Sequence, residues 1–176
     1  RANALVALAG GEMARLQLSD DQKKGIENAL IHPVSIIAGL PGTGKTTSLR
    51  SAVRILQDAS IPFLLVAPTG IAAKRLSSLT GADACTIHRA FVAKGKSDEN
   101  DNRTYLGVQG ESAQQDVGDF EDGEWEYGPG NPHPAEVVIV DESSMIDQHL
   151  LYRLLSCTKP TARLVFVGDH AQLPSV

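Results

Sequence analysis

A glycine-rich segment of the chain carries the residue types that bind polyphosphates. It reads Gly-Leu-Pro-Gly-Thr-Gly-Lys-Thr and fits the pattern G-x-x-x-x-G-K-[ST]. Glycines let the backbone wrap closely around phosphate oxygens, and successive N–H groups present partial positive charge to them. The phosphate-binding residues predicted from this pattern are Gly39, Pro41, Gly42, Thr43, Gly44, Lys45 and Thr46.

The last two residues of this loop can act in catalysis as well as in binding. Lys45 can reach the β- and γ-phosphates of ATP, and the Thr46 hydroxyl can bind Mg²⁺. A glycine-rich turn that binds no nucleotide is the alternative. The apolar run before the loop and the amphipathic stretch after it disfavour that alternative, because a phosphate-binding loop joins a strand to a helix. ATP and Mg²⁺ are therefore the predicted cofactors.

Two adjacent acids, Asp141 and Glu142, follow the continuous apolar run Val137–Val140. Such a run indicates a strand that is buried on both faces, and ligands of open α/β sheets bind at the carboxyl ends of their strands. Asp141, together with Thr46, is predicted to hold Mg²⁺, partly through water. Glu142 is predicted to polarise the water that attacks the γ-phosphate. Acids in this place also cap helices, which is the alternative for the pair taken alone.

Gln172 follows the last apolar run of the chain. Its uncharged amide can form a hydrogen bond with a γ-phosphate and so report that the phosphate is present. A glutamine in a surface loop has the same spacing, and the two interpretations stay open at this point.

The elements that must position these residues alternate between short β-branched runs and amphipathic stretches. This alternation is typical of an α/β fold with a parallel sheet and flanking helices, as in P-loop NTPases. Strands are predicted at 34–38, 62–67, 137–140 and 163–167, and helices at 44–58, 70–79 and 147–156.

The composition is that of one soluble globular domain. The 176 residues are 42% hydrophobic and 21% charged, and no run of about 18 apolar residues predicts a membrane span. Cys85 and Cys157 are too few for a disulfide framework, so we expect a cytoplasmic protein. Because the chain begins at Arg1 rather than at methionine, we expect it to be cut from a longer protein.

The net charge of −5 is unevenly distributed. The segment 98–136 carries eleven acids and one base, a net charge of −10, which leaves +5 for the rest of the chain. Periodicity also fails between about residues 93 and 134. A loop of this length is typically functional, mobile or inserted, although solvated loops are often charged without any specific role.

Taken together, these segments resemble the first motor domain of superfamily 1B DNA helicases, in the RecD-like branch that includes the exodeoxyribonuclease V alpha chain and the helicase part of conjugative relaxases. The Leu-Pro after Gln172 points to this branch. The matching segments, in order, are Leu18–Gln22 for the adenine-reading Q motif, Gly39–Thr47 for motif I, Ala67–Leu76 for motif Ia, Thr86–Arg89 for motif Ib, Val140–Met145 for motif II and Gly168–Val176 for motif III.

The resemblance implies a RecA-like domain over residues 18–176, with 1–17 as a lead-in from a preceding region. It implies that Gln22 reads adenine, that Thr47 belongs to the nucleotide site, and that Gln172 is catalytic and couples the γ-phosphate to DNA. Four further residues are placed along single-stranded DNA by the resemblance, namely Pro68, Thr69, Thr86 and His88. Lys74, Arg75 and Arg89 could add positive charge there, although a solvated helix face explains Lys74 and Arg75 as well.

Two departures from the family pattern are present. Ser143 stands where the family usually has alanine, and the connection from Arg89 to the acid strand is about twice the usual length. Residues 125–136 resemble the family's own connection, so about 94–124 is predicted to be an acidic insertion. Its charge suits contact with a protein partner, or a gate that keeps DNA from one face.

The function that follows is that of an ATP-dependent DNA helicase, which couples ATP hydrolysis to movement on single-stranded DNA and to duplex unwinding. The resemblance implies 5′ to 3′ travel, work in DNA recombination and repair, and a second RecA-like domain outside this sequence that supplies arginines to the site. We therefore expect weak ATPase activity from these residues alone. The alternatives are a P-loop ATPase without unwinding activity, a superfamily 1 RNA helicase, and a non-enzymatic module that works through the acidic insertion.

Overall fold

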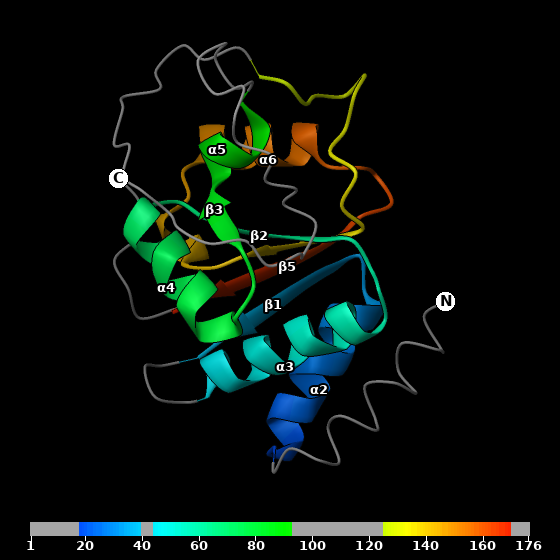
Figure 1. Cartoon of the computed structure of the whole chain (residues 1–176), viewed down its shortest axis with the longest axis vertical. Coiled ribbons are helices and arrows are strands. Elements are labelled where there is room, and N and C mark those ends of the chain that lie inside the picture. Colours follow the sequence, from blue (N-terminus) through cyan, green and yellow to red (C-terminus); the bar gives the residue numbers. More distant parts are fainter. Residues whose placement is uncertain (1–17, 40–43, 93–124, 170–176) are drawn as a thin grey trace.

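A computed structural model of the chain describes residues 18–39, 44–92 and 125–169 (Figure 1). A parallel sheet of five strands runs through these residues in the order β1-β5-β4-β2-β3. The strands are β1 (Val34–Ala38), β2 (Phe63–Ala67), β3 (Ala84–Thr86), β4 (Val137–Val140) and β5 (Arg163–Gly168). The predicted parallel α/β sheet is thereby confirmed.

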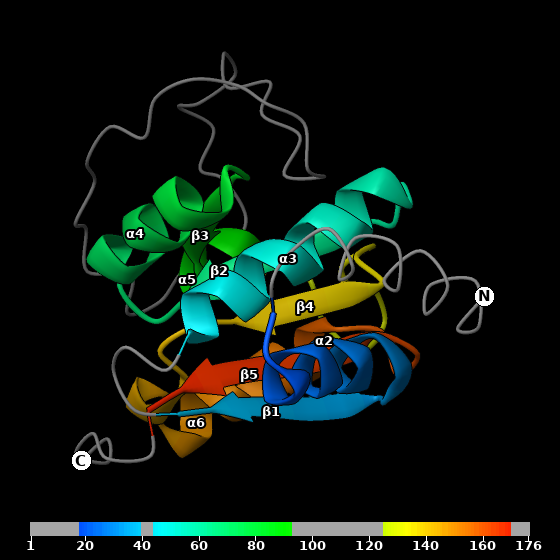
Figure 2. The same cartoon turned by 90° about the horizontal axis from the view of Figure 1, so that it is seen from below.

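Helices cover both faces of this sheet, as Figures 1 and 2 show. One face carries three helices, and the other carries the two that lie near the 125–136 connection. A short 3-10 turn, η1 (Ser143–Met145), follows β4 and precedes the second of these two helices in the chain. The first group is α2 (Asp20–Ile31), α3 (Lys45–Asp58) and α4 (Gly70–Thr80), and the second is α5 (Ile87–Phe91) and α6 (Gln148–Cys157).

Strand β4 shows how the two layers are held together. Its alternating side chains point to opposite faces: Val137 and Ile139 pack with α2 and α3, and Val138 and Val140 pack with α5 and α6. All four are at most 1% exposed. Burying an aliphatic side chain of this size stabilises a fold by about 1.5–3 kcal/mol, so this strand anchors the residues that follow it.

The register of the sheet brings the loops after the strands to one edge. Phe166 of β5 pairs with Ile36 of β1 on one side and with Val140 of β4 on the other, and Val140 in turn pairs with Val66 of β2. Parallel strands end at the same edge, so the segments that follow β1, β4 and β2 emerge together. These are the segments for which the sequence predicts chemistry.

The predicted strands and helices agree with the structure to within about two residues, and four elements were not predicted, one of them the 3-10 turn η1. The helix predicted from Gly44 begins at Lys45, because Gly44 has a φ of 87° and caps the helix instead. Strand β3 and helix α5 have three and five residues, too few to show a period. Helix α2 did carry a signal, the capping box formed by Ser19 and Gln22, but this segment also matches the adenine-reading Q motif and was predicted to be that alone.

Within the described residues, no helix is long and apolar enough to cross a membrane.

A cluster of aromatic rings joins α5 to the connection before β4. The His133 ring is buried, with its centroid 5.7 Å from that of Phe91 and 4.8 Å from that of Tyr127. Its Nδ1 atom accepts a hydrogen bond from the Ala135 N–H at 3.2 Å, which requires the neutral ring to carry its proton on Nε2. Burial, reinforced by the charge of Lys159, lowers the pKa of His133 from 6.5 to about 4.

We predict that acid destabilises the fold through His133. The unfolded chain binds a proton at this histidine below about pH 6.5, whereas the folded chain resists doing so until about pH 4. The contribution of His133 to the free energy of unfolding should therefore be constant above about pH 6.5. As the pH is lowered from about 6.5 to about 4, the free energy of unfolding should fall by an amount on the order of 1–3 kcal/mol. Urea unfolding across this range measures it.

The control is His133→Asn, whose side-chain oxygen can still accept the Ala135 N–H but does not titrate. Its stability relative to the parent protein should rise as the pH falls through the same window. A constant difference between the two proteins would contradict the assignment to His133.

Candidate active site

The phosphate loop joins the end of β1 to the start of α3. Gly39, Gly44, Lys45, Thr46 and Thr47 are described, and Pro41, Gly42 and Thr43 lie outside the described residues. Lys45 is the first residue of α3, and its Nζ donates a hydrogen bond to the Gly39 carbonyl oxygen. Thr46 and Thr47 are exposed in the first turn, so the Thr46 hydroxyl is open to a ligand at the helix N-terminus.

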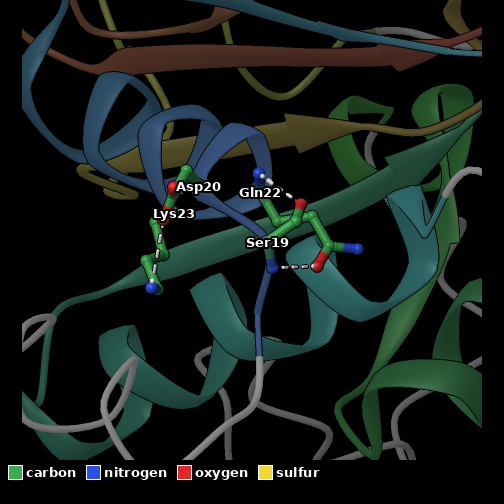
Figure 3. Close-up of polar contacts among 4 residues, drawn as sticks. All are labelled: Ser19, Asp20, Gln22 and Lys23. Carbon is green, nitrogen blue, oxygen red and sulfur yellow. Dashed lines mark hydrogen bonds and ion pairs between the residues drawn. The ribbon is translucent and has the colours of Figure 1, made fainter.

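Gln22 connects helix α2 to this loop. In the capping box of Figure 3, its Oε1 accepts the Ser19 N–H at 3.0 Å and its own N–H donates to the Ser19 Oγ at 3.3 Å. The Gln22 Nε2 donates to the Gly44 carbonyl oxygen at 3.4 Å. A Cβ on Gly44 would collide with this same amide. The structure thus brings Gln22 to Gly44 of the glycine-rich loop, and the predicted contact of Gln22 with adenine stays a prediction.

Asp141 continues the sheet beyond β4. Its N–H donates to the Val66 carbonyl oxygen at 2.9 Å, which fixes the backbone next to β2. The pKa of the Asp141 carboxyl is raised above its usual value, mainly by burial and also by the neighbouring Glu142 carboxylate. A hydrogen bond from the Glu142 N–H and the charges of Arg75 and Lys45 oppose this increase. Lys45 and Asp141, which are 96 positions apart in the sequence, therefore lie close enough to interact.

The donors at this edge fit Mg²⁺ bound together with a nucleotide. The Thr46 hydroxyl and the Asp141 carboxylate supply oxygens, the ligand type that Mg²⁺ prefers. No group of three or more His, Cys, Asp or Glu side chains in the described part of the chain could hold a metal ion by itself. Mg²⁺ usually retains several waters and takes further ligands from substrate phosphates, so it can be bound with only one or two protein oxygens.

Glu142 has an unusual backbone conformation and a charged partner. Its φ of 51° and ψ of 40° lie in the left-handed region, which costs a residue other than glycine about 1–2 kcal/mol. Its Oε1 atom is 3.3 Å from an Arg75 guanidinium nitrogen on α4. Backbone strain of this kind persists where the surroundings enforce it, and it is common at functional sites.

The end of β5 approaches the acid pair closely. A Cβ on Gly168 would lie 2.8 Å from the Ser143 Oγ, so only glycine fits there without a shift. This contact was not predicted, and a Gly-Asp pair after a strand is the signal that could have indicated it. Gln172, four residues further along, lies outside the described residues, as do residues 94–124 of the predicted insertion.

The residues predicted to follow single-stranded DNA lie after β2 and at the end of β3. Ala67 and Thr86 are partners in the register of these two strands, so Pro68 and Thr69 emerge beside Thr86. The Thr69 hydroxyl caps α4 by accepting the Ala72 N–H at 3.2 Å, and the Thr86 hydroxyl caps α5 by accepting the Arg89 N–H at 3.2 Å. The structure brings these residues to the same sheet edge as the phosphate loop.

His88 lies differently from the two threonines. Its ring centroid is 6.0 Å from that of Trp125, on the connection that follows the predicted insertion. Trp125 also has the Arg153 guanidinium 5.3 Å from its ring centroid. His88 is partly exposed and helps to hold α5 against this connection, so it has a structural role besides the predicted contact with DNA.

Comparison with known proteins agrees with this geometry. Residues 22–176 match the AAA domain family. The chain is 36% identical over 164 residues to RecBCD enzyme subunit RecD of Haemophilus influenzae, and 33% identical over 163 residues to the ATP-dependent RecD2 DNA helicase of Deinococcus radiodurans. The solved structure of Pif1 helicase from Candida albicans superposes on 92% of the chain with a TM-score of 0.57 and 25% identity.

The chain spans only part of these proteins. The matches cover 90% and 93% of this chain, but 24% of the RecD subunit and 19% of RecD2. The chain likewise covers 34% of the Pif1 structure. The comparisons therefore concern one domain of much longer relatives.

We predict that Gly44→Ala weakens nucleotide binding. The substitution places a Cβ against the Gln22 amide at a residue whose φ is 87°, so both the loop and α2 must shift. The dissociation constant of a fluorescent ATP analogue, measured with Mg²⁺ present, should rise about tenfold, which equals about 1.4 kcal/mol.

The matched control is Gly25→Ala in α2, where a Cβ meets nothing within 4 Å. Its affinity for the analogue should not change, and the fold should gain about 0.5–1 kcal/mol because alanine favours a helix over glycine. Equal affinities of the Gly44→Ala and Gly25→Ala proteins would contradict the role given to Gly44.

We also predict that Glu142→Gly is more stable than Glu142→Ala. Both variants lose the carboxylate, but only glycine relieves the left-handed backbone, so chemical denaturation should show a difference of about 0.5–1 kcal/mol in favour of glycine. Ser60→Gly is the matched control, since Ser60 has a φ of 52° away from the site and should gain stability in the same way. If Glu142→Gly is no more stable than Glu142→Ala, the left-handed backbone at residue 142 is not strained.

Proposed function

Because this chain belongs to the AAA domain family, with RecD-type helicases among its relatives, we propose that it is the ATP-hydrolysing motor domain of an ATP-dependent DNA helicase. One observation carries the proposal. The start of α3 with Lys45 and the end of β4 with Asp141 and Glu142 share a sheet edge with the exposed loop at Thr69. Nucleotide and DNA would therefore be bound by adjacent segments of one rigid sheet.

ATP would lie across the phosphate loop, with the adenine toward Gln22. Backbone N–H groups from Gly39 to Thr47 and the N-terminus of α3 favour the phosphate oxygens, and Lys45 exchanges its Gly39 partner for the β- and γ-phosphates. Thr46 and Asp141 would hold Mg²⁺. The metal supplies charge neutralisation for the phosphates when it is bound.

Glu142 would orient the attacking water and accept its proton, since it follows Asp141 directly at the same edge of the sheet. Gln172 would form a hydrogen bond with the γ-phosphate and link its presence to the DNA site. The arginines that stabilise transition-state charge in related NTPases contribute about 10³ to 10⁵ in rate, and a second RecA-like domain would supply them here.

Single-stranded DNA would run over Pro68, Thr69, Thr86 and His88. Hydroxyl groups and the N-terminus of α4 suit backbone phosphates, which carry affinity without reading sequence. Opening and closing of the cleft between the two motor domains would then move the strand and separate a duplex. The RecD relative is named as a subunit of an assembled enzyme, so assembly with further subunits is part of the proposal.

We predict that Lys45→Ala and Glu142→Gln separate binding from chemistry in the complete protein. Lys45→Ala removes the charge that meets the phosphates, so ATP affinity and turnover should both fall. Glu142→Gln keeps the shape of the side chain but cannot accept a proton, so turnover should fall by about 10²-fold or more while ATP affinity is retained. Phosphate release and binding of a fluorescent ATP analogue measure the two quantities.

Arg163→Ala is the matched control for a substitution away from the site, because Arg163 lies at the start of β5, at the opposite end of the sheet. Its ATP affinity and turnover should match those of the parent protein. Turnover that survives in both Lys45→Ala and Glu142→Gln would show that this site does not hydrolyse ATP.

A further inference from the structure

An ion pair links Glu142, the proposed catalytic base, to α4, the helix that begins after the proposed DNA-binding residues Pro68 and Thr69. The Arg75 guanidinium donates to Glu142 Oε1 at 3.3 Å, across 67 positions of sequence. The Glu142 side chain is 20% exposed and the Arg75 side chain 64% exposed. A partly buried carboxylate is thus held by an exposed guanidinium that remains open to other partners.

This contact restrains the chemistry that Glu142 must perform. A general base needs a free oxygen directed at the water it activates. The Arg75 N–H occupies one carboxylate oxygen and draws it toward α4. The left-handed backbone of Glu142 fixes the stem of the side chain, so the orientation of the carboxylate depends on its charged partner.

Arg75 is also placed to meet DNA. It lies four residues after Ile71, which is 86% exposed in the first turn of α4, so both side chains are on one face of the helix. Helical side chains slope toward the N-terminus, which here is the Thr69 end of the helix. The Arg75 side chain therefore extends toward the end of α4 at which a DNA phosphate would bind.

The pair is weak enough to be exchanged. Exposed ion pairs contribute little because solvent and salt screen them, whereas a phosphate can accept two parallel N–H bonds from one guanidinium. We propose that Arg75 restrains Glu142 when no DNA is bound, and that a backbone phosphate of single-stranded DNA takes the guanidinium and releases Glu142 for catalysis. This inference rests on the proposed function and names the residue through which DNA stimulates that site.

The test is steady-state ATP turnover of the complete protein with and without saturating oligodeoxythymidylate. In Arg75→Ala, kcat without DNA should rise about two- to fivefold, the range expected for loss of one exposed ion pair, while kcat at saturating DNA stays unchanged. Stimulation by DNA should shrink by the same factor, and KM for ATP should not move. Arg75→Gln, which keeps most of the stem without the charge, should behave alike, and Arg75→Lys should restore the low rate.

Arg54→Ala is the matched control. Arg54 on α3 is 69% exposed and lies 3.9 Å from the Asp58 carboxylate, away from the site, so its loss should leave both rates unchanged. The double variant Arg75→Ala with Glu142→Gln should turn over ATP no faster than Glu142→Gln alone, because the gain passes through Glu142. A raised rate that survives in this double variant would overturn the proposal.

Two other results would also overturn it. If Arg75→Ala leaves the DNA-free rate unchanged and only raises the DNA concentration needed for half-maximal stimulation, Arg75 is a DNA contact alone. If both rates fall, Arg75 supports catalysis rather than restraining it. Absence of ATP turnover in the parent protein would overturn the proposed function as well. If the parent protein turns over ATP, Lys45→Ala abolishes this turnover and Arg75→Ala leaves the DNA-free rate unchanged, only the Arg75 proposal is overturned.

Discussion

Backbone hydrogen bonds across β1, β5, β4 and β2 hold the phosphate loop and the acid pair at one edge of the sheet. The strands are parallel and in a register that pairs Ile36 with Phe166, Phe166 with Val140 and Val140 with Val66. A slip of one residue would turn every alternating side chain to the other face, and the buried apolar residues of β4 prevent it. The chemistry therefore depends on a core that contains none of the reacting groups.

Much of this arrangement could be predicted from the sequence, because its signals are local. The glycine-rich loop and the acids after Val140 occupy fixed places between recognisable strands and helices, and the parallel sheet implies that they meet. The short elements β3 and α5 carry too few residues to show a period, and α2 was missed because its capping residues were assigned to adenine recognition. The Arg75–Glu142 pair joins positions far apart in sequence, so only the packing of α4 against the sheet reveals it.

The site combines rigid and exchangeable contacts. Asp141 is fixed by a backbone hydrogen bond to β2, and Ser143 packs so closely against Gly168 that a side chain there would collide with it. Lys45 and Glu142, by contrast, contact the Gly39 carbonyl oxygen and the Arg75 guanidinium, partners that we propose are exchanged when ATP and DNA bind. A motor needs both kinds of contact, since binding can shift an equilibrium only where the ligand interacts differently with the two states.

If one sheet edge binds both nucleotide and single-stranded DNA, as we propose, binding at either site must alter the other. The most direct measurement is the affinity of the complete protein for a fluorescent oligodeoxythymidylate, by anisotropy, with and without a non-hydrolysable ATP analogue and Mg²⁺. We expect the dissociation constant to change by about fivefold or more with the analogue, the usual range for coupled sites. Lys45→Ala should remove this change. If the analogue binds the protein but leaves the dissociation constant for DNA unaltered, the two sites do not share this edge as proposed.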